Sequence, residues 1–112
     1  MQPALQAKES LDFKIHYNNK FNCFYSISIF ESIGGLKIND IVQIKIDSRH
    51  YCYCEIVEVK NLTLDEIIIQ GLHYLDTGFN EKEYRELWKR IHPNKNLVIL
   101  YFKKITQLKL FN

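Results

Sequence analysis

The sequence has few of the residues that interrupt or cross-link a chain, with four glycines, two prolines and three cysteines in 112 residues. No hydrophobic run approaches the roughly 20 residues that cross a bilayer, and the first residues lack the basic-then-apolar pattern of a signal peptide. Three cysteines without a regular spacing argue against a secreted disulfide framework. We therefore expect a cytoplasmic protein that does not span a membrane.

The scarcity of cysteine and glycine also bears on metal and cofactor sites. Cys52 and Cys54 lie two residues apart and would share one face of a strand. Zinc sites normally combine two such pairs, so small buried cysteines are the simpler interpretation. Gly34 and Gly35 alone do not make a phosphate-binding loop. The sequence predicts no metal site and no cofactor.

What the chain does contain is the composition of one globular domain. Hydrophobic residues make up 46% and charged residues 25%, which is far from the composition of disordered chains. Residues 1–81 hold seven Lys or Arg and eleven Asp or Glu, a net charge of −4, whereas residues 82–112 hold eight and two, a net charge of +6. Such a basic segment attracts phosphate, although a solvated helix face with a basic tail would look the same.

Strand signals dominate the chain. The clearest is the alternation of Val42, Ile44 and Ile46 with polar neighbours, which is typical of a half-buried strand. In the run that follows, the alternation shifts and indicates a β-bulge. Alternating or aromatic-rich runs predict strands at residues 13–16, 21–30, 41–47, 51–60 and 97–102.

Two capping boxes predict helices between the last two strands. Thr63 with Glu66 opens a short helical stretch, and Asn80 with Glu83 opens the clearest helix, at Glu81–Ile91. Side chains at helical spacing give that helix one apolar face, with Trp88 as its expected core anchor. The members of this face are Tyr84, Leu87, Trp88 and Ile91.

This order of elements predicts an α+β fold. Short strands joined mainly by hairpins curl into a small β-barrel or a strongly bent, mostly antiparallel sheet, here with two helices inserted before a late strand. We expect residues 1–12 to be a polar leader that is disordered at least in part, and residues 13–112 to form a single domain.

Several segments, taken in order, resemble the ASCH domains of the PUA-like superfamily. Residues 36–44 (LKINDIVQI) resemble the family's L-x-x-G-D-x-v-x-i turn and strand, and residues 51–59 (YCYCEIVEV) are similar to its next strand. Residues 62–67 and 75–84 resemble its helical region, and residues 98–105 its closing strand. The resemblance implies a PUA-like β-barrel with a cleft that binds RNA or modified nucleotides. Some small members are amidohydrolases of acetylated cytidine, and others are described as ribonucleases.

The cleft of that family is marked by a G-K-K-T-x-T-x-R motif, from which this chain departs. Ser26 and Ser28 occupy the two threonine positions, whereas Phe30 replaces the arginine and Tyr25 the second lysine. Lys20 lies near the motif but out of register with it. A hydroxyl needs a base or a lowered pKa to act as a nucleophile, so the missing cations favour a module without catalysis.

Our first hypothesis is therefore a non-catalytic module that binds RNA, in preference to DNA, or nucleotides. Tyr25, Ser26 and Ser28 would line the cleft. Single-stranded nucleic acid is commonly bound by rings that stack on bases and cations that contact phosphates. The residues of these two types that we expect to contact nucleic acid are Tyr25, Tyr51, Tyr53, Arg85, Lys89 and Arg90.

Two alternatives remain open. A small hydrolase of a modified nucleoside such as N4-acetylcytidine would use Ser26 or Ser28 as its hydroxyl and Glu55, on the bulged strand, as general base. A protein-interaction subunit of a phage or mobile-element system, as a homodimer or with another protein, would use its aromatic residues, 13% of the chain, as an interface.

Overall fold

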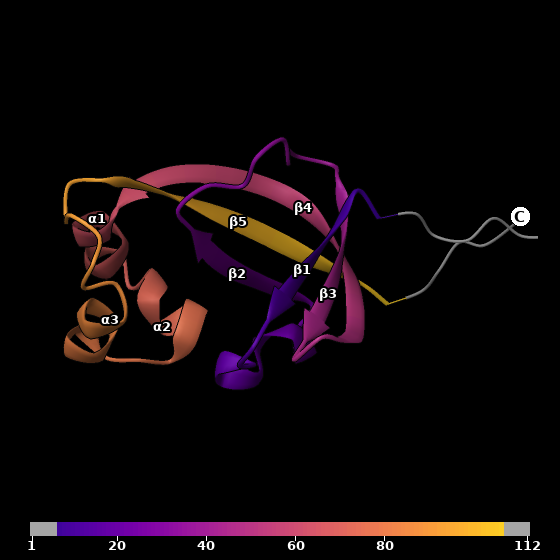
Figure 1. Cartoon of the computed structure of the whole chain (residues 1–112), viewed down its shortest axis with the longest axis horizontal. Helices are drawn as coiled ribbons and strands as arrows, with labels where there is room; N and C mark the ends of the chain where they lie inside the picture. Colours follow the sequence, from indigo (N-terminus) through magenta and orange to yellow (C-terminus); the bar gives the residue numbers. More distant parts are fainter. Residues whose placement is uncertain (1–6, 107–112) are drawn as a thin grey trace, which may run out of the picture.

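Five strands form one mixed sheet, and three helices are inserted between the last two strands of the sequence (Figure 1). The computed structural model describes residues 7–106. Residues 1–6 of the expected leader and residues 107–112 of the basic segment lie outside the described residues. The strands are β1 (Glu9–Phe13), β2 (Tyr25–Phe30), β3 (Ile41–Ile46), β4 (Arg49–Thr63) and β5 (Asn96–Ile105). The helices are the 3₁₀-helix η1 (Tyr17–Asn22), α1 (Leu64–Ile69), α2 (Leu72–Thr77) and α3 (Glu81–Leu87).

The sheet bends but does not close. Its strand order is β1-β3-β4-β5-β2; β1 pairs with β3 in parallel, and the other three pairings are antiparallel. Within residues 7–106, β1 and β2 are the two edges and do not pair with each other. The α+β class is thus confirmed, and of the two expected forms the chain adopts the bent, mostly antiparallel sheet rather than the closed barrel, because no pairing joins β1 to β2 within the described residues.

The β-bulge predicted in the fourth strand is present. The pairing of β4 with β5 shifts register between Ile56 and Glu58. Bulges bend a strand and increase its twist. β4 is thereby able to follow the curve of the sheet over 15 residues, from the β3 hairpin to the helices (Figure 1).

The first third of the chain differs most from the expected boundaries. β1 covers Glu9–Phe13 rather than residues 13–16, so residues 9–12 of the expected leader are part of the sheet. β2 begins at Tyr25 rather than Phe21, because the preceding residues form η1. Within η1, Asn18 and Asn19 adopt left-handed conformations, with φ of 59° and 48°, which asparagine tolerates better than most residues.

Both predicted capping boxes are present, at the start of α1 and of α3. The helical insertion nevertheless has three helices instead of two, because Gly71, with φ of 76°, ends α1 and starts α2. α3 ends at Leu87 rather than Ile91, and Trp88 is its C-cap with φ of −103° and ψ of 22°. Tyr84 is therefore the fully buried anchor of α3, while Trp88 is only half-buried. No helix in residues 7–106 is long and apolar enough to span a bilayer.

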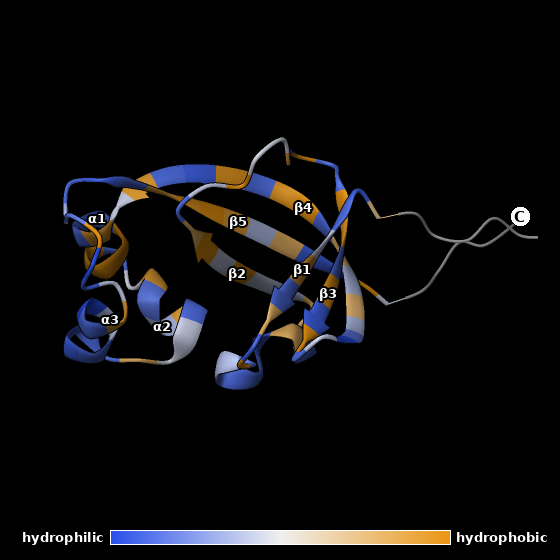
Figure 2. Cartoon of the chain, in the orientation of Figure 1, coloured by the Kyte–Doolittle hydropathy of each residue, from blue (hydrophilic) through white to orange (hydrophobic). Residues whose placement is uncertain are grey.

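Two hydrophobic clusters stabilise the fold, one on each face of the bent sheet. The first lies inside the curve and includes Phe21, Ile44 and Phe102. The second lies between the sheet and the helices and includes Ile67 and Tyr84. The hydropathy pattern follows this division, with polar residues alternating along β4 and covering the outer side of α3 (Figure 2). Between the clusters, the free edge of β2 faces η1 and the helices.

Candidate functional site

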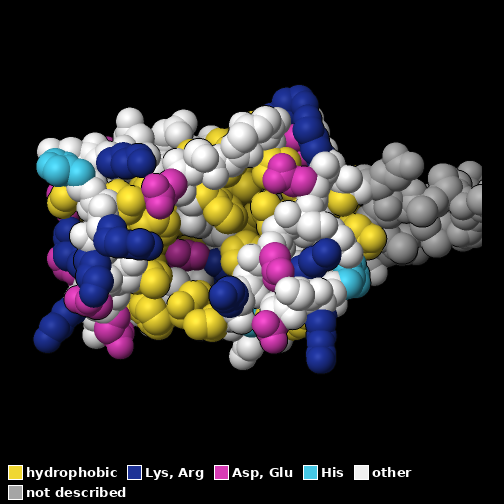
Figure 3. Space-filling view, in the orientation of Figure 1, with side chains coloured by type: hydrophobic (Ala, Val, Ile, Leu, Met, Phe, Trp, Pro, Cys, Tyr) yellow, Lys and Arg dark blue, Asp and Glu magenta, His cyan; other side chains and the backbone are white. Residues whose placement is uncertain are grey.

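A pocket of about 460 Å³ opens where β2, the end of β1 and the helical insertion meet. Its volume is within the range of small-molecule sites. On the face that Figure 3 shows, hydrophobic side chains gather between the helices and the strands. The lining combines aromatic, apolar and charged side chains, namely Phe13, Ile15, Tyr17, Lys20, Ser28, Ile29, Glu31, Asp76, Thr77, Leu87, Trp88, Arg90 and Ile91.

A buried ion pair joins the two sides of this pocket. Lys20 Nζ of η1 lies 2.6 Å from Asp76 Oδ1 of α2, and each residue is only 6% exposed. The second carboxylate oxygen, Asp76 Oδ2, accepts a hydrogen bond of 2.7 Å from the hydroxyl of Tyr84 in α3. The Lys20 ammonium also lies 5.7 Å and 5.5 Å from the ring centroids of Phe13 and Phe21. The pair of charges is thus surrounded by η1, α2 and α3 and by the rings of Phe13 and Phe21.

The local structure of η1 determines where Lys20 points. The backbone N–H of Phe21 donates to His16 Nε2 over 2.9 Å, and the two rings stack at 5.6 Å. Asn18 Nδ2 donates to the Tyr74 carbonyl of α2 over 3.3 Å. At the end of α2, Gly78 has φ of 81°, and a Cβ there would lie 3.3 Å from Asn18. This close approach of η1 and α2 brings the lysine to the aspartate.

Burial shifts the protonation equilibria of this cluster. Desolvation lowers the pKa of Lys20 below the usual value for lysine, and the attraction of Asp76 offsets only part of that effect. Burial raises the pKa of the Tyr84 hydroxyl, and the adjacent Asp76 carboxylate raises it further. Tyr84 therefore remains a proton donor to Asp76, and Lys20 is the group in the cluster that gives up its proton more readily than usual.

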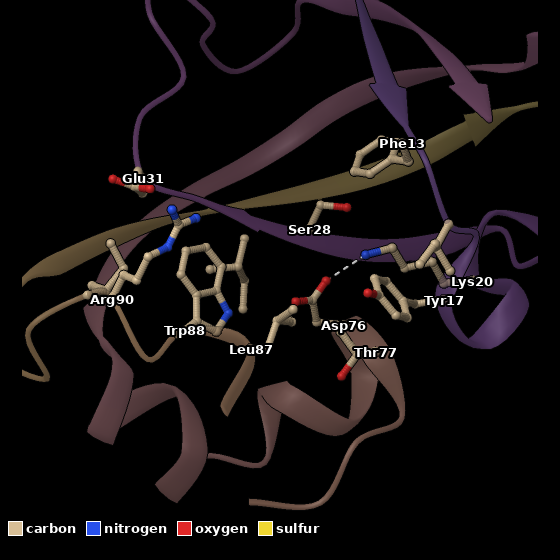
Figure 4. A pocket seen from close by; sticks show the side chains of 13 residues that line it. Phe13, Tyr17, Lys20, Ser28, Glu31, Asp76, Thr77, Leu87, Trp88 and Arg90 are labelled. Carbon is tan, nitrogen blue, oxygen red and sulfur yellow. Dashed lines mark hydrogen bonds and ion pairs between the residues drawn. The ribbon is translucent and has the colours of Figure 1, made fainter. Parts of the chain in front are cut away.

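Two buried polar atoms of the pocket lining, Ser28 Oγ and Trp88 Nε1, have no hydrogen-bond partner among residues 7–106. Ser28 lies on the edge strand β2 and is 1% exposed. In Figure 4 the Ser28 hydroxyl points toward the side of the pocket where Phe13 and the Lys20 ammonium lie. A buried hydroxyl without a partner costs about 1–3 kcal/mol. Such a group is suited to a hydrogen bond with a bound molecule.

Trp88 and Arg90 form the opposite wall, just after the end of α3. Figure 4 shows the indole of Trp88 facing the pocket and the guanidinium of Arg90 at its rim, near Glu31. Glu31 Oε1 lies 3.4 Å from Lys95 Nζ. Arg90 has no ion-pair partner among residues 7–106. The early end of α3 therefore places one ring and one cation at the mouth of the pocket.

The six residues expected to contact nucleic acid do not lie on one surface. Arg85 pairs with Asp65 at 2.8 Å and Glu81 at 3.0 Å, and Lys89 pairs with Glu86 at 2.9 Å. Tyr51 and Tyr53 lie near the start of β4, at the opposite end of the described fold from α3 (Figure 1). There, the Tyr51 hydroxyl donates to Asn22 and the Tyr53 ring lies 4.8 Å from that of His50. Of the six, only Arg90 lines the pocket that contains Ser28.

The remaining candidates are distributed differently from expectation. Tyr25 and Ser26 line a second pocket, of about 490 Å³, farther along β2. Glu55 lines neither pocket and sits in the sheet between Ile41 and Lys103. The carboxylates that line the pocket with Ser28 are consequently Glu31 and Asp76, not Glu55. Within residues 7–106, no three His, Cys, Asp or Glu side chains are grouped closely enough to hold a metal ion.

Sequence reasoning did not place Lys20 and Asp76 in the site, and it assigned Trp88 to the core. In the sequence, Lys20 is out of register with the family motif, and Asp76 belongs to an Asp-Thr-Gly turn. The available signal was the Asn18-Asn19 dipeptide, because a left-handed turn there changes the direction of the next side chain. That signal indicates a turn but does not identify a partner 56 residues away.

Comparisons with known proteins give a fold and no closer relationship. No family model matches the sequence, and no curated protein matches it. The structure is similar to the crystal structure of a mutant ZmASCH protein from Zymomonas mobilis, with a TM-score of 0.61 and 8% sequence identity. The match covers 92% of this chain and 76% of the other. The chain therefore has an ASCH-like fold, as the sequence resemblance predicted.

We predict that breaking the Lys20–Asp76 pair destabilises the protein more than removing both charges. Lys20→Met leaves a buried carboxylate without its cation and should lower the free energy of unfolding by about 3–5 kcal/mol. Adding Asp76→Asn removes that charge, keeps an acceptor for Tyr84, and should restore at least half of the loss. Urea unfolding measures both. Lys89→Met, in an exposed pair, is the control and should cost at most about 1 kcal/mol. Equal losses in the single and double variants would contradict this account.

We also predict that His16 makes stability depend on pH. Burial, followed by the charges of Lys20 and Lys104, lowers the pKa of His16 below 6.5. As pH falls below 6.5, the unfolded chain takes up the proton first, so stability is complete above that pH and decreases below it. Protonation also removes the Nε2 lone pair that accepts from Phe21.

Urea unfolding between pH 7.5 and 5 checks the His16 prediction. His16→Gln should flatten the decrease in unfolding free energy over this range. His50→Gln, which removes an exposed imidazole, is the control and should retain it. An unchanged pH profile in His16→Gln would rule out this role for His16.

Proposed function

We propose that this ASCH-like domain is a nucleotide- or RNA-binding module and that the pocket around Ser28 receives one nucleobase. The observation that carries the proposal is the unpaired, 1% exposed Ser28 hydroxyl facing the buried Lys20–Asp76 pair. Buried polar groups normally have partners. A ligand with a polar edge and a flat apolar face matches the composition of this pocket.

The groups of the pocket correspond to the parts of a nucleotide. The Ser28 hydroxyl can donate or accept, and the Lys20 ammonium has three donors, of which Asp76 takes one. Both groups can therefore hydrogen-bond to the edge of a base. The rings of Tyr17 and Trp88 offer faces on which a base can stack. At the rim, the guanidinium of Arg90 is suited to a phosphate.

The arrangement of the ion pair favours binding over catalysis. Both oxygens of Asp76 already accept a hydrogen bond, one from Lys20 and the other from Tyr84, so a structural role accounts for this carboxylate without a role in proton transfer. The preference for RNA over DNA derives from the family resemblance and would require contact with the 2′-hydroxyl.

The test is a comparison of ribonucleosides with their monophosphates by calorimetric or NMR titration. Ser28→Ala should weaken the binding of both kinds of ligand about tenfold, the equivalent of one hydrogen bond of about 1.4 kcal/mol. Arg90→Ala should weaken only the monophosphates, because it removes the phosphate contact. Lys89→Ala, whose cation already pairs with Glu86, is the matched control. If no ribonucleoside or monophosphate binds at millimolar concentration, the proposal is wrong.

A second candidate, the hydrolysis of an acylated nucleoside, is favoured by one observation. The Ser28 hydroxyl faces a lysine whose pKa burial has lowered. A neutral Lys20 amine could take the Ser28 proton while Oγ attacks the acyl carbon and the nucleoside amine leaves with a proton. Water would then release the acyl group.

The hydrolytic candidate predicts the release of acetate from N4-acetylcytidine. Ser28→Ala should abolish the release, since it removes the nucleophile, whereas Ser26→Ala should keep it because Ser26 lines the other pocket. Proton NMR of the acetate methyl group measures the product. If the wild-type protein releases no acetate, or if both variants retain the activity, hydrolysis through Ser28 is excluded.

A further inference from the structure

The second pocket lies along the same edge strand as the first. Residues 25–27 of β2 line the second pocket, whereas residues 28, 29 and 31 line the first. A strand rises about 3.3 Å per residue, so the middle of the segment that lines the second pocket is only about 7–10 Å from the middle of the segment that lines the first. Lys20 lines both pockets. The two pockets are thus neighbouring parts of one groove along β2, with Lys20 at the boundary between them.

The second pocket is apolar and has exposed aromatic surface. Tyr25 is 64% exposed at its mouth, and Tyr101 forms part of its wall. Its carboxylate, Glu58, lies 3.7 Å from Lys60, whose ammonium is 5.4 Å from the Tyr101 ring centroid. Ser26 adds one hydroxyl. The tyrosine rings offer flat faces on which a base can stack, and the charge of Glu58 is already paired with Lys60. This pocket therefore suits a base better than a phosphate.

The ion pair also limits which kind of chain could occupy the groove. An extended peptide would bind an edge strand by continuous backbone pairing. In Figure 4, however, the Lys20–Asp76 pair lies beside β2, where it would interfere with such pairing. A strand of nucleotides needs no backbone pairing with the protein. Its linkage would pass the Lys20 ammonium, which has donors that Asp76 does not use.

We propose that the second pocket is a second base subsite, so that the ligand is a dinucleotide or a longer single strand. The inference rests on the proposed function of the first pocket. One base would lie against Ser28, the next would stack on Tyr25, and the phosphodiester between them would lie beside Lys20. Tyr25 then determines the preference for linked nucleotides over free ones, while Ser28 serves both ligands.

Titrations of cytidine 5′-monophosphate and the dinucleotide CpC test this inference. The wild-type protein should bind CpC at least tenfold more tightly. Tyr25→Ala should abolish this gain and leave the affinity for the monophosphate unchanged, whereas Tyr25→Phe should keep the gain because it retains the ring. Tyr74→Ala removes a tyrosine of similar exposure, 54%, that lines neither pocket, and should change nothing.

The outcomes separate this inference from the proposed function. Equal affinities for the two ligands, or a loss in Tyr25→Ala that is the same for both, would overturn the second subsite and leave the first intact. No binding of either ligand would overturn both. If a library of unstructured eight-residue peptides binds in a Tyr25-dependent manner while CpC shows no gain, the second pocket belongs to a protein partner and the inference is wrong.

Discussion

The buried ion pair between Lys20 and Asp76 is the interaction on which the arrangement of the site depends. Removing two charges from water costs several kcal/mol per ion, and only close geometry with further hydrogen bonds offsets that cost. Here the offset requires η1 to supply the lysine, α2 the aspartate and α3 the Tyr84 hydroxyl. These elements must therefore pack in one arrangement for the pair to form. The same packing leaves the edge of β2 at the bottom of a groove.

The features that follow from short segments were predictable from the sequence. Each capping box needs only residues three positions apart, so Thr63 and Asn80 were recognised as helix starts. The bulge in β4 followed from a shift in local alternation. The order of segments along the chain was sufficient to predict the ASCH-like fold. The structure is similar to that of ZmASCH although the two sequences are only 8% identical. The fold thus depends mainly on which positions are buried, and many different sequences can satisfy that requirement.

The features that were missed depend on contacts between distant segments. Lys20 and Asp76 are 56 residues apart, and neither has a local pattern that identifies the other. The net charge of residues 82–112 suggested a phosphate-binding surface, but a count of charges does not show which cations pair with acidic side chains, as Arg85 and Lys89 do. The periodicity of α3 extended to Ile91, yet Trp88 leaves the helix at the pocket wall. In each case, tertiary contacts determine what the side chain does.

The open edge of the sheet gives these contacts their functional meaning. Full closure of a barrel removes its edges, and a strand paired with β2 would cover the side on which both pockets lie. Exposed edges invite unwanted pairing, and proteins commonly protect them with charges or with covering elements. In this chain, the Lys20–Asp76 pair and the adjacent helices cover the edge while leaving a space on each side. The pair that protects β2 from another strand therefore also lies where its two pockets meet. The pocket with more charged and polar side chains is the one that contains the Ser28 hydroxyl, which has no hydrogen-bond partner in the described structure.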